Sequence, residues 1–282
     1  MGQREIDQGD VLAAGRLQIS VHGRGVGGAV LILSQSDVER LLTMDACIDV
    51  MASTLSALAR GDAVLPLRTI IGIPQTKDFF AVMPGYLGEP KAIGAKVLTV
   101  YPENHGTALD SHQGAVLLFD PENGSLAAVL DATSITTTRT AAVSAVATRA
   151  LARHDASTLA IIGSGVQAHA HLEAMCAVRP ITALRVWSRN ADHARTFAQF
   201  ARDTFRLSAT AVDTGGAAVH GADIVCAATS SNDPVVLGEW LSPGTHVNAV
   251  GTSQPHAREL DSAAVIASRL YVDRRESALN EP

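Results

Sequence analysis

The chain lacks the features that define several protein classes. It contains only three cysteines, Cys47, Cys176 and Cys226, which are widely spaced, form no CxxC motif and are odd in number. We therefore expect neither a disulfide framework nor a metal site, and we interpret each cysteine as a small core residue. No apolar run reaches about 18 residues, which argues against a membrane-spanning helix.

Basic charge is also scarce. The 282 residues carry a formal net charge of −6, and no cluster of basic residues interrupts this balance. Such a charge disfavours a nucleic-acid partner. The first 18 residues contain no apolar signal-peptide core, so we expect a cytoplasmic protein. Hydrophobic residues make up 47% and charged residues 18%, as in ordinary globular proteins, and the length of 282 residues suggests two domains.

The pattern of the chain changes near residues 28 and 133. Residues 1–28 are polar and rich in glycine, and we interpret them as a flexible N-terminal extension with folded structure beginning near Val30. Residues 29–133 are expected to form one domain. Residues 134–282 are expected to form a second, which begins with a linking helix over 134–152 that contains no glycine or proline.

The first domain should contain helices and an antiparallel sheet. A capped helix is expected over 34–42 and a second helix over 44–58. Short β-favouring runs then alternate with proline and glycine, and Asn123-Gly124 suits a hairpin turn. The predicted strands are Arg68–Ile73, Phe79–Met83, Ala92–Tyr101, Gly114–Phe119 and Ser125–Leu130.

The second domain alternates between strands and helices. This alternation predicts an α/β fold with a doubly wound parallel sheet of the Rossmann type beside the α+β domain. One helix is expected over Ala191–Phe205. Six strands are expected, at 158–162, 183–188, 207–212, 223–228, 245–250 and 269–273.

A glycine turn follows the first of these strands. Its six residues are Gly163, Ser164, Gly165, Val166, Gln167 and Ala168, which match the pattern GxGxxG/A. The first glycine suits a tight turn, the second lets a pyrophosphate approach the backbone, and the small third residue lets helix and strand pack closely. Because the motif lies between a predicted strand and a predicted helix, we expect a dinucleotide site.

The end of the second strand indicates which dinucleotide is preferred. NAD enzymes usually place a carboxylate there for the ribose 2′-hydroxyl, whereas this chain has Ser188, Arg189 and Asn190. A guanidinium beside hydroxyl and amide donors suits a 2′-phosphate. We therefore expect NADP(H) to be preferred, with NAD(H) possible. Thr229 and Ser230, after the fourth strand, are expected near the nicotinamide.

Three cations lie in apolar surroundings in the sequence. They are Arg68, Lys96 and Arg139, and each alone is best explained as a buried ion pair or a side chain that reaches solvent. Together, in a chain with a dinucleotide turn, they indicate an anion pocket for a small carboxylate substrate. His112 could donate a proton near them, although a structural histidine is the better interpretation.

A linked set of motifs resembles the ornithine cyclodeaminase/μ-crystallin family from about Val30 onward. The resemblance implies a homodimer joined through the first domain, an active site between the domains, and Arg68, Lys96 and Arg139 as ligands of the substrate carboxylate. Val250 and Gly251 join the expected cofactor-binding residues. The motifs are Met83-Pro-Gly-Tyr86, Gly94-Ala-Lys96, His112-Gln-Gly114, Arg139-Thr-Ala-Ala142, the glycine turn and Asn248-Ala-Val-Gly251.

Two departures from the family pattern refine this expectation. The cyclodeaminases of the family carry an aspartate where this chain has Ser253, and a serine hydroxyl is a poor general base near neutral pH. Ser253 is instead similar to the imine reductases of the family and is expected to contact the substrate ring or a water. The second departure is that the sequence ends at Pro282, shortly after the predicted sixth strand, whereas family members usually continue with a helix that returns to the first domain.

The sequence therefore predicts an NAD(P)H-dependent reductase of cyclic imino acids. The expected reactions convert Δ1-pyrroline-2-carboxylate or Δ1-piperideine-2-carboxylate to L-proline or L-pipecolate, with Lys96, Arg139, Arg68 and Ser253 as the catalytic set. The alternatives are an ornithine cyclodeaminase, an alanine-type amino-acid dehydrogenase, and a non-enzymatic protein that binds small molecules together with NADPH.

Overall fold

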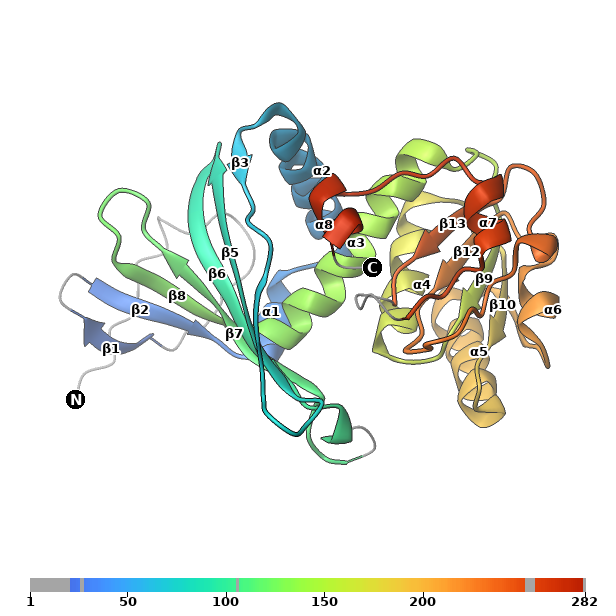
Figure 1. Cartoon of the computed structure of the whole chain (residues 1–282), viewed down its shortest axis with the longest axis horizontal. Helices are drawn as coiled ribbons and strands as arrows, with labels where there is room; N and C mark the ends of the chain where they lie inside the picture. Colours follow the sequence, from blue (N-terminus) through green and yellow to red (C-terminus); the bar gives the residue numbers. More distant parts are fainter. Residues whose placement is uncertain (1–20, 26–27, 105–106, 252–256, 281–282) are drawn as a thin grey trace.

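The structure, a computed structural model, describes residues 21–25, 28–104, 107–251 and 257–280. Two β-sheets lie at opposite ends of the molecule, and helix α3, Ala132–Leu151, runs between them (Figure 1). The helix packs on strands of both sheets. The expected linking helix is thus present, and it brings the two halves of the chain into contact.

The first sheet has eight strands and is almost entirely antiparallel. Its order is β1-β2-β8-β7-β6-β5-β3, with β4 also pairing with β5. Only β2 and β8 run parallel to each other. The strands are β1 Val21–Gly25, β2 Gly28–Leu33, β3 Ala63–Val64, β4 Thr69–Gly72, β5 Phe79–Gly88, β6 Lys91–Val100, β7 His112–Phe119 and β8 Leu126–Asp131.

Strand β5 is longer than predicted. We expected a strand to end at Met83 because Pro84 and Gly85 follow it, but β5 continues to Gly88 and pairs with β6 along its whole length. On its other side β5 pairs with β4 as far as Val82 and with β3 from Tyr86. Pro84 lies in the gap between these two pairings. No neighbouring strand on that side would accept a hydrogen bond from its backbone nitrogen, and a strand tolerates proline at such a position.

Part of the expected N-terminal extension also forms a strand. Residues 21–25 form β1, which pairs antiparallel with β2 through Arg24 opposite Ala29 and Gly25 opposite Gly28. The prediction that folded structure begins near Val30 is wrong for this segment, because main-chain hydrogen bonds of a hairpin do not require apolar side chains. Residues 1–20 lie outside the described residues.

Two helices precede the central strands of the first sheet. They are α1, Gln35–Leu41, and α2, Met44–Arg60, and both start within the predicted ranges. Helix α2 packs on α3. No single helix in the described ranges is long and apolar enough to cross a membrane; only α1 and α2 taken together, with an 81° bend between them, meet that test of length and composition.

The second sheet confirms the predicted α/β class. Its five strands are all parallel and follow the order β11-β10-β9-β12-β13, the doubly wound arrangement of a dinucleotide-binding fold. The strands are β9 Thr158–Ile162, β10 Ala183–Trp187, β11 Ser208–Ala211, β12 Ile224–Ala227 and β13 His246–Ala249. The helices are α4 Val166–Val178, α5 Ala191–Phe205, α6 Gly215–Val219, α7 Ser262–Ala267 and α8 Arg275–Asn280, and single 3-10 turns occur at Pro102–Asn104 and Gly238–Trp240.

The predicted sixth strand is absent. Residues 269–273 have no strand structure, and Leu270 and Tyr271 are 69% and 56% exposed. This segment leaves the sheet and leads to α8, which is drawn beside α3 in Figure 1. An apolar, β-favouring run does not form a strand unless a sheet edge lies alongside it, and here the chain passes beyond the edge strand β13.

The larger hydrophobic core surrounds the second sheet. The side chains of Leu159, Ile161 and Ile162 in β9 are fully buried, and so are Ile224 and Val225 in β12. Both strands are central, so helices cover them on two faces, which explains their uninterrupted apolar sequences. The sheet is thus a rigid base for the loops that leave the carboxyl ends of its strands.

Candidate active site

The glycine turn after β9 has the geometry that its sequence predicts. Gly163 adopts a φ of +117°, and a Cβ atom there would lie 2.4 Å from the carbonyl oxygen of Ala228. Only glycine fits such a position without displacing the neighbouring loop. Ala168 is fully buried, so a small side chain lets α4 approach the sheet closely.

The start of α4 suits a phosphate group. Gly165 is the N-cap of α4 and supplies no side-chain hydrogen bond, whereas α1, α2, α3, α5, α6 and α7 are each capped by a side chain. A Cβ atom on Gly165 would have no atom of the described chain within 4 Å. Free N–H groups, a positive helix end and open space above the backbone are what a dinucleotide pyrophosphate needs. The residues at this turn therefore fit the expected cofactor.

The end of β10 lies directly beside this turn. The Ser164 hydroxyl donates a hydrogen bond to the Ser188 hydroxyl over 2.8 Å. Asn190 uses its side-chain oxygen to cap α5 by accepting from the N–H groups of Asp192 and His193. Its oxygen therefore has a structural role that the sequence did not reveal. Arg189 is exposed next to the two serines, where a guanidinium can reach a ligand.

The loops after β12 and β13 are joined by one buried carboxylate. Glu259, which is 3% exposed, accepts hydrogen bonds from the Thr229 N–H at 2.6 Å and hydroxyl at 2.8 Å. Its other oxygen accepts from the N–H groups of Gly251 at 2.6 Å and Val250 at 3.3 Å. Glu259 was not among the predicted site residues, because the sequence shows only an acidic residue that follows the Asn-Ala-Val-Gly run by eight positions.

The close contact between these loops explains a second glycine. A Cβ atom on Gly251 would lie 1.9 Å from the Thr229 carbonyl oxygen. Any larger residue would push the two loops apart. Thr229, Val250 and Gly251, which are among the expected cofactor-binding residues, thus form one connected group with Glu259 at the carboxyl edge of the sheet.

The structure brings the three predicted cations together. Lys96 lies on β6, Arg139 on α3, and Arg68 just before β4. Lys96 is on the face of β6 that also carries the buried Leu98 and Val100, because alternate residues of a strand share a face. That face is the one packed on α3, so Lys96 and Arg139 approach each other between the two layers.

Burial and mutual repulsion lower the pKa values of Lys96 and Arg139. Burial, followed by the charges of Arg139 and Arg68, lowers the pKa of Lys96 from 10.5 to about 8. Burial is also the main cause that lowers the pKa of Arg139, and Arg68 adds to it. Like charges that are partly removed from water raise the free energy of the unliganded site and favour an anion between them.

Two further residues lie close to the cations. The Lys96 Nζ donates a hydrogen bond to the Thr136 hydroxyl over 3.2 Å, which orients the ammonium group. Asp273, in the segment that precedes α8, is close enough for its charge to raise the pKa of Arg139. The segment expected to be a sixth strand therefore reaches the cation group. Nothing in the sequence distinguishes Thr136 from its neighbouring threonines.

His112 lies at the edge of the same group. Partial burial and then the charge of Lys96 lower its pKa, which favours a neutral ring. Its Nδ1 atom is 3.1 Å from the Ser111 hydroxyl, and its carbonyl oxygen accepts from Thr133. These contacts suit the structural interpretation of His112. Ser253, the fourth residue of the predicted catalytic set, lies outside the described residues.

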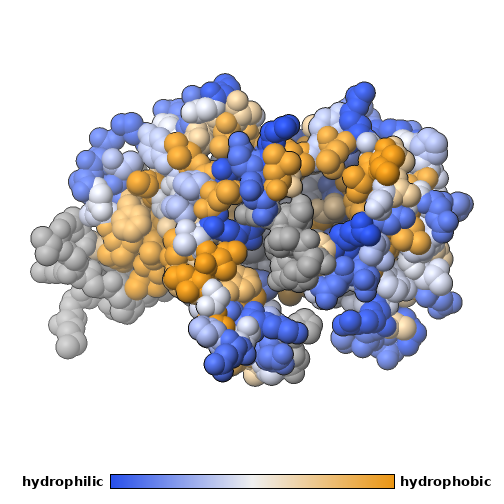
Figure 2. Space-filling view, in the orientation of Figure 1, coloured by the Kyte–Doolittle hydropathy of each residue, from blue (hydrophilic) through white to orange (hydrophobic). Residues whose placement is uncertain are grey.

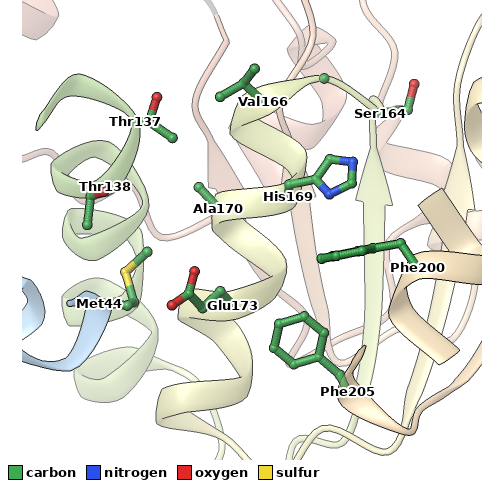
Figure 3. Close-up of a pocket in the computed structure, with 11 residues that line it drawn as sticks. Met44, Thr137, Thr138, Ser164, Val166, His169, Ala170, Glu173, Phe200 and Phe205 are labelled. Carbon is green, nitrogen blue, oxygen red and sulfur yellow. The ribbon is translucent and has the colours of Figure 1, made fainter. Parts of the chain in front are cut away.

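A cavity of about 570 Å³ adjoins the glycine turn but does not contain the cations. Figure 3 shows it between α3, α4 and α5, with the ring of His169 against Phe200. Its lining includes Ser164 and Gly165, so it is open to the phosphate end of the cofactor site. Within the described ranges no group of three His, Cys, Asp or Glu residues gathers as metal ligands, and all three cysteines are free.

Comparisons with known proteins agree with this geometry. Residues 29–281 match the profile of the ornithine cyclodeaminase/mu-crystallin family. Ketimine reductase mu-crystallin of Mus musculus is 41% identical over 221 residues, which is 78% of this chain and 69% of that protein. Delta(1)-pyrroline-2-carboxylate reductase of Bacillus cereus (strain ZK / E33L) is 35% identical over 253 residues, 89% of this chain and 78% of that protein.

Solved structures are similar over most of the chain. The Thermococcus litoralis Delta(1)-pyrroline-2-carboxylate reductase, in complex with NADH and L-proline, has a TM-score of 0.86 and 40% identity, covering 89% of this chain and 78% of that one. An archaeal alanine dehydrogenase dimer with bound NAD has a TM-score of 0.83 and 31% identity, covering 88% and 76%.

Proposed function

The chain belongs to the ornithine cyclodeaminase/mu-crystallin family, and on this premise we propose that it reduces cyclic imino acids. It is an NAD(P)H-dependent oxidoreductase that acts on C=N or CH–NH bonds. The proposed substrates are Δ1-pyrroline-2-carboxylate and Δ1-piperideine-2-carboxylate, which yield L-proline and L-pipecolate. The observation that carries this proposal is the meeting of Lys96, Arg68 and Arg139 in a chain whose glycine turn fits a dinucleotide.

The three cations have complementary tasks in this proposal. Arg139 and Arg68 hold the substrate carboxylate, because a guanidinium can bind a carboxylate through two parallel hydrogen bonds. Lys96, positioned by Thr136, adds a third positive charge that is only partly hydrated. Fixing the carboxylate orients the neighbouring C=N bond, which converts an encounter between two molecules into a reaction within one site.

The proton of the imine also needs control. A protonated C=N bond is the better hydride acceptor, so the site has to admit an iminium without a strong general base. With a pKa of about 8, Lys96 can hold a proton at neutral pH and also release it within the site. When bound, the nicotinamide supplies the hydride, and the chain supplies orientation and charge.

NADP(H) is proposed as the preferred cofactor. The support is local: Arg189 is exposed beside the linked hydroxyls of Ser164 and Ser188, at the edge where a ribose 2′-phosphate would lie. No aspartate or glutamate occupies positions 187–190. NAD(H) remains an acceptable cofactor in this proposal, since the glycine turn itself does not distinguish the two.

We further propose a homodimer joined through the first sheet. Tyr86, Ile93, Phe119 and Leu126 lie opposite one another on successive strands and so share a face, the one turned away from Lys96. Tyr86 and Ile93 are 41% and 42% exposed. Figure 2 shows apolar residues gathered over this part of the molecule. An uncovered apolar sheet face favours burial against a second copy.

The test of the function is steady-state turnover. Purified protein is mixed with NADPH or NADH and each imine, and the absorbance of the reduced cofactor is followed. We expect oxidation of the cofactor only when an imine is present, with a higher kcat/KM for NADPH than for NADH. Clean NADPH binding without turnover of either imine would contradict the reductase and favour a binding protein.

Amino-acid dehydrogenation is the second candidate. The likeness to the archaeal alanine dehydrogenase, with a TM-score of 0.83, favours it. The same cations would then hold the carboxylate of an open-chain amino acid. Reduction of NAD(P)⁺ by L-alanine at a higher kcat/KM than by L-proline would support this candidate over the cyclic imine.

A further inference from the structure

The carboxylate of Glu259 is buried at the carboxyl edge of the second sheet. Both of its oxygens accept hydrogen bonds, from Thr229 on one side and from Val250 and Gly251 on the other. Four donors and no acceptor at these oxygens match an ionised carboxylate. In the part of the chain that the structure describes, no lysine or arginine forms an ion pair with it.

The position of this charge relative to the cofactor site follows from the fold. β12 lies next to β9, whose glycine turn fits the pyrophosphate, and β13 lies on the other side of β12; all three strands are parallel. Their carboxyl ends therefore share one edge, and a dinucleotide that starts at the turn extends along that edge. Thr229 and Gly251, which Glu259 holds, belong to the loops proposed for the nicotinamide end.

The two redox forms of nicotinamide differ in charge at this end. The oxidised ring carries one positive charge and the reduced ring carries none. When a hydride moves from the reduced ring to the imine carbon, a C–H bond of the ring breaks and a new C–H bond forms at the imine carbon. The ring thereby gains the positive charge. A fixed negative charge nearby stabilises the ring after this transfer more than before it.

We propose that Glu259 is a positioning residue whose buried charge makes the site favour the oxidised cofactor over the reduced one. This inference rests on the proposed dinucleotide site. It adds to the structural role of Glu259, which is to join the loops after β12 and β13. A structural role alone would affect both redox forms equally, whereas a charge affects their ratio.

The experiment measures dissociation constants of NADP⁺ and NADPH by calorimetric titration, without substrate. Glu259→Gln removes the charge and can keep three of the four contacts, because the amide oxygen accepts from Val250 and Gly251 while the amide nitrogen donates to the Thr229 hydroxyl. A unit charge acting over about 10 Å at an effective dielectric of about 20 changes a binding constant roughly tenfold. We expect the ratio Kd(NADP⁺)/Kd(NADPH) to rise by about that factor.

Two controls separate charge from geometry. Glu259→Asp keeps the charge but shortens the side chain, so it should weaken both forms by similar factors and change the ratio less than about twofold. Glu239→Gln removes the same charge from an exposed position of the same domain and should change neither constant. Ser230→Lys, at an exposed site beside Thr229, adds the opposite charge and should raise the ratio as Glu259→Gln does.

The outcomes are distinct. An unchanged ratio in Glu259→Gln, or equal changes in Glu259→Gln and Glu259→Asp, would overturn the inference and leave Glu259 a purely structural residue. If circular dichroism shows that Glu259→Gln is unfolded, an unchanged ratio in Ser230→Lys would still overturn the inference, because it would show that a charge at this edge does not act on the nicotinamide. Failure of the unmodified protein to bind either cofactor would instead contradict the proposed function.

Discussion

Lys96 should lower the stability of the folded chain although it contributes to substrate binding, and the Lys96→Met variant tests this expectation directly. In the folded chain its pKa is about 8, below the ordinary value of 10.5. The folded state therefore binds the proton less tightly than the unfolded state does. At about 1.4 kcal/mol per pKa unit, this difference corresponds to about 3 kcal/mol of lost stability when Lys96 is protonated.

The sign of the pH dependence follows from the same shift. Below pH 8 Lys96 is charged in both states, so the full destabilisation is present. As pH rises from 8 to 10.5, only the unfolded state still binds the proton, and the destabilisation disappears. Methionine has a similar length and no charge. Its substitution also removes the hydrogen bond to Thr136, which costs about 1 kcal/mol.

We therefore expect Lys96→Met to be more stable than the unmodified protein by about 2 kcal/mol at pH 7, with little or no gain near pH 10. Urea unfolding, followed by circular dichroism at both pH values, measures this difference. The buffer must contain no multivalent anions, because these would bind the cation group. The same variant should lose at least about a hundredfold in kcat/KM for the imine.

Lys91→Met is the matched control. Lys91 lies on the same strand, but its side chain is exposed and pairs with Glu122 at the surface. Its removal should change stability by less than about 1 kcal/mol. The reasoning is refuted if Lys96→Met is less stable than the unmodified protein at pH 7, or if its stability gain is the same at pH 7 and pH 10.

The other predictions concern the same site. Because an anionic substrate favours protonated Lys96, kcat/KM for the imine should be constant below pH 8 and fall up to tenfold per pH unit above it; a flat profile to pH 9.5 would contradict this. Gly165→Ala meets no atom of the described chain, so thermal unfolding should be unchanged while the Kd for NADPH rises at least about tenfold. Gly163→Ala, which collides with a carbonyl oxygen, should instead lower stability by about 2–4 kcal/mol. Arg189→Ala should weaken NADPH binding about ten- to hundredfold and leave NADH unchanged, whereas Arg195→Ala on the neighbouring helix should affect neither; equal losses for both cofactors would refute the preference.

Local patterns predicted the second domain well. The strand 158–162, the turn at Gly163 and the helix 191–205 appear in the structure with those bounds or that geometry. Each depends on interactions between residues close in sequence: an apolar run, a residue that tolerates positive φ, and a capped helical period. The predictions were wrong where the structure of a segment depends on its neighbours in space. Examples are the strand end predicted before Pro84 and the strand predicted over residues 269–273.

The candidate site was predicted only in part for the same reason. Arg68, Lys96 and Arg139 could be singled out because each is a cationic residue in an apolar stretch of the sequence. Thr136 and the joining role of Glu259 could not, since nothing near them in sequence distinguishes them from surface residues. Thr136 contacts Lys96, from which it is separated by 40 residues of sequence, and Glu259 contacts the loop that follows a different strand.

The sequence by itself determined the class of the fold, the position of the glycine turn and the absence of a carboxylate at the end of β10. These depend on residue type and short spacing, which folding does not change. Only the tertiary structure decided that three cations repel one another between α3 and the first sheet, and that one buried carboxylate joins two loops. Burial and distance set the free energy of a charge, and both are properties of the folded chain.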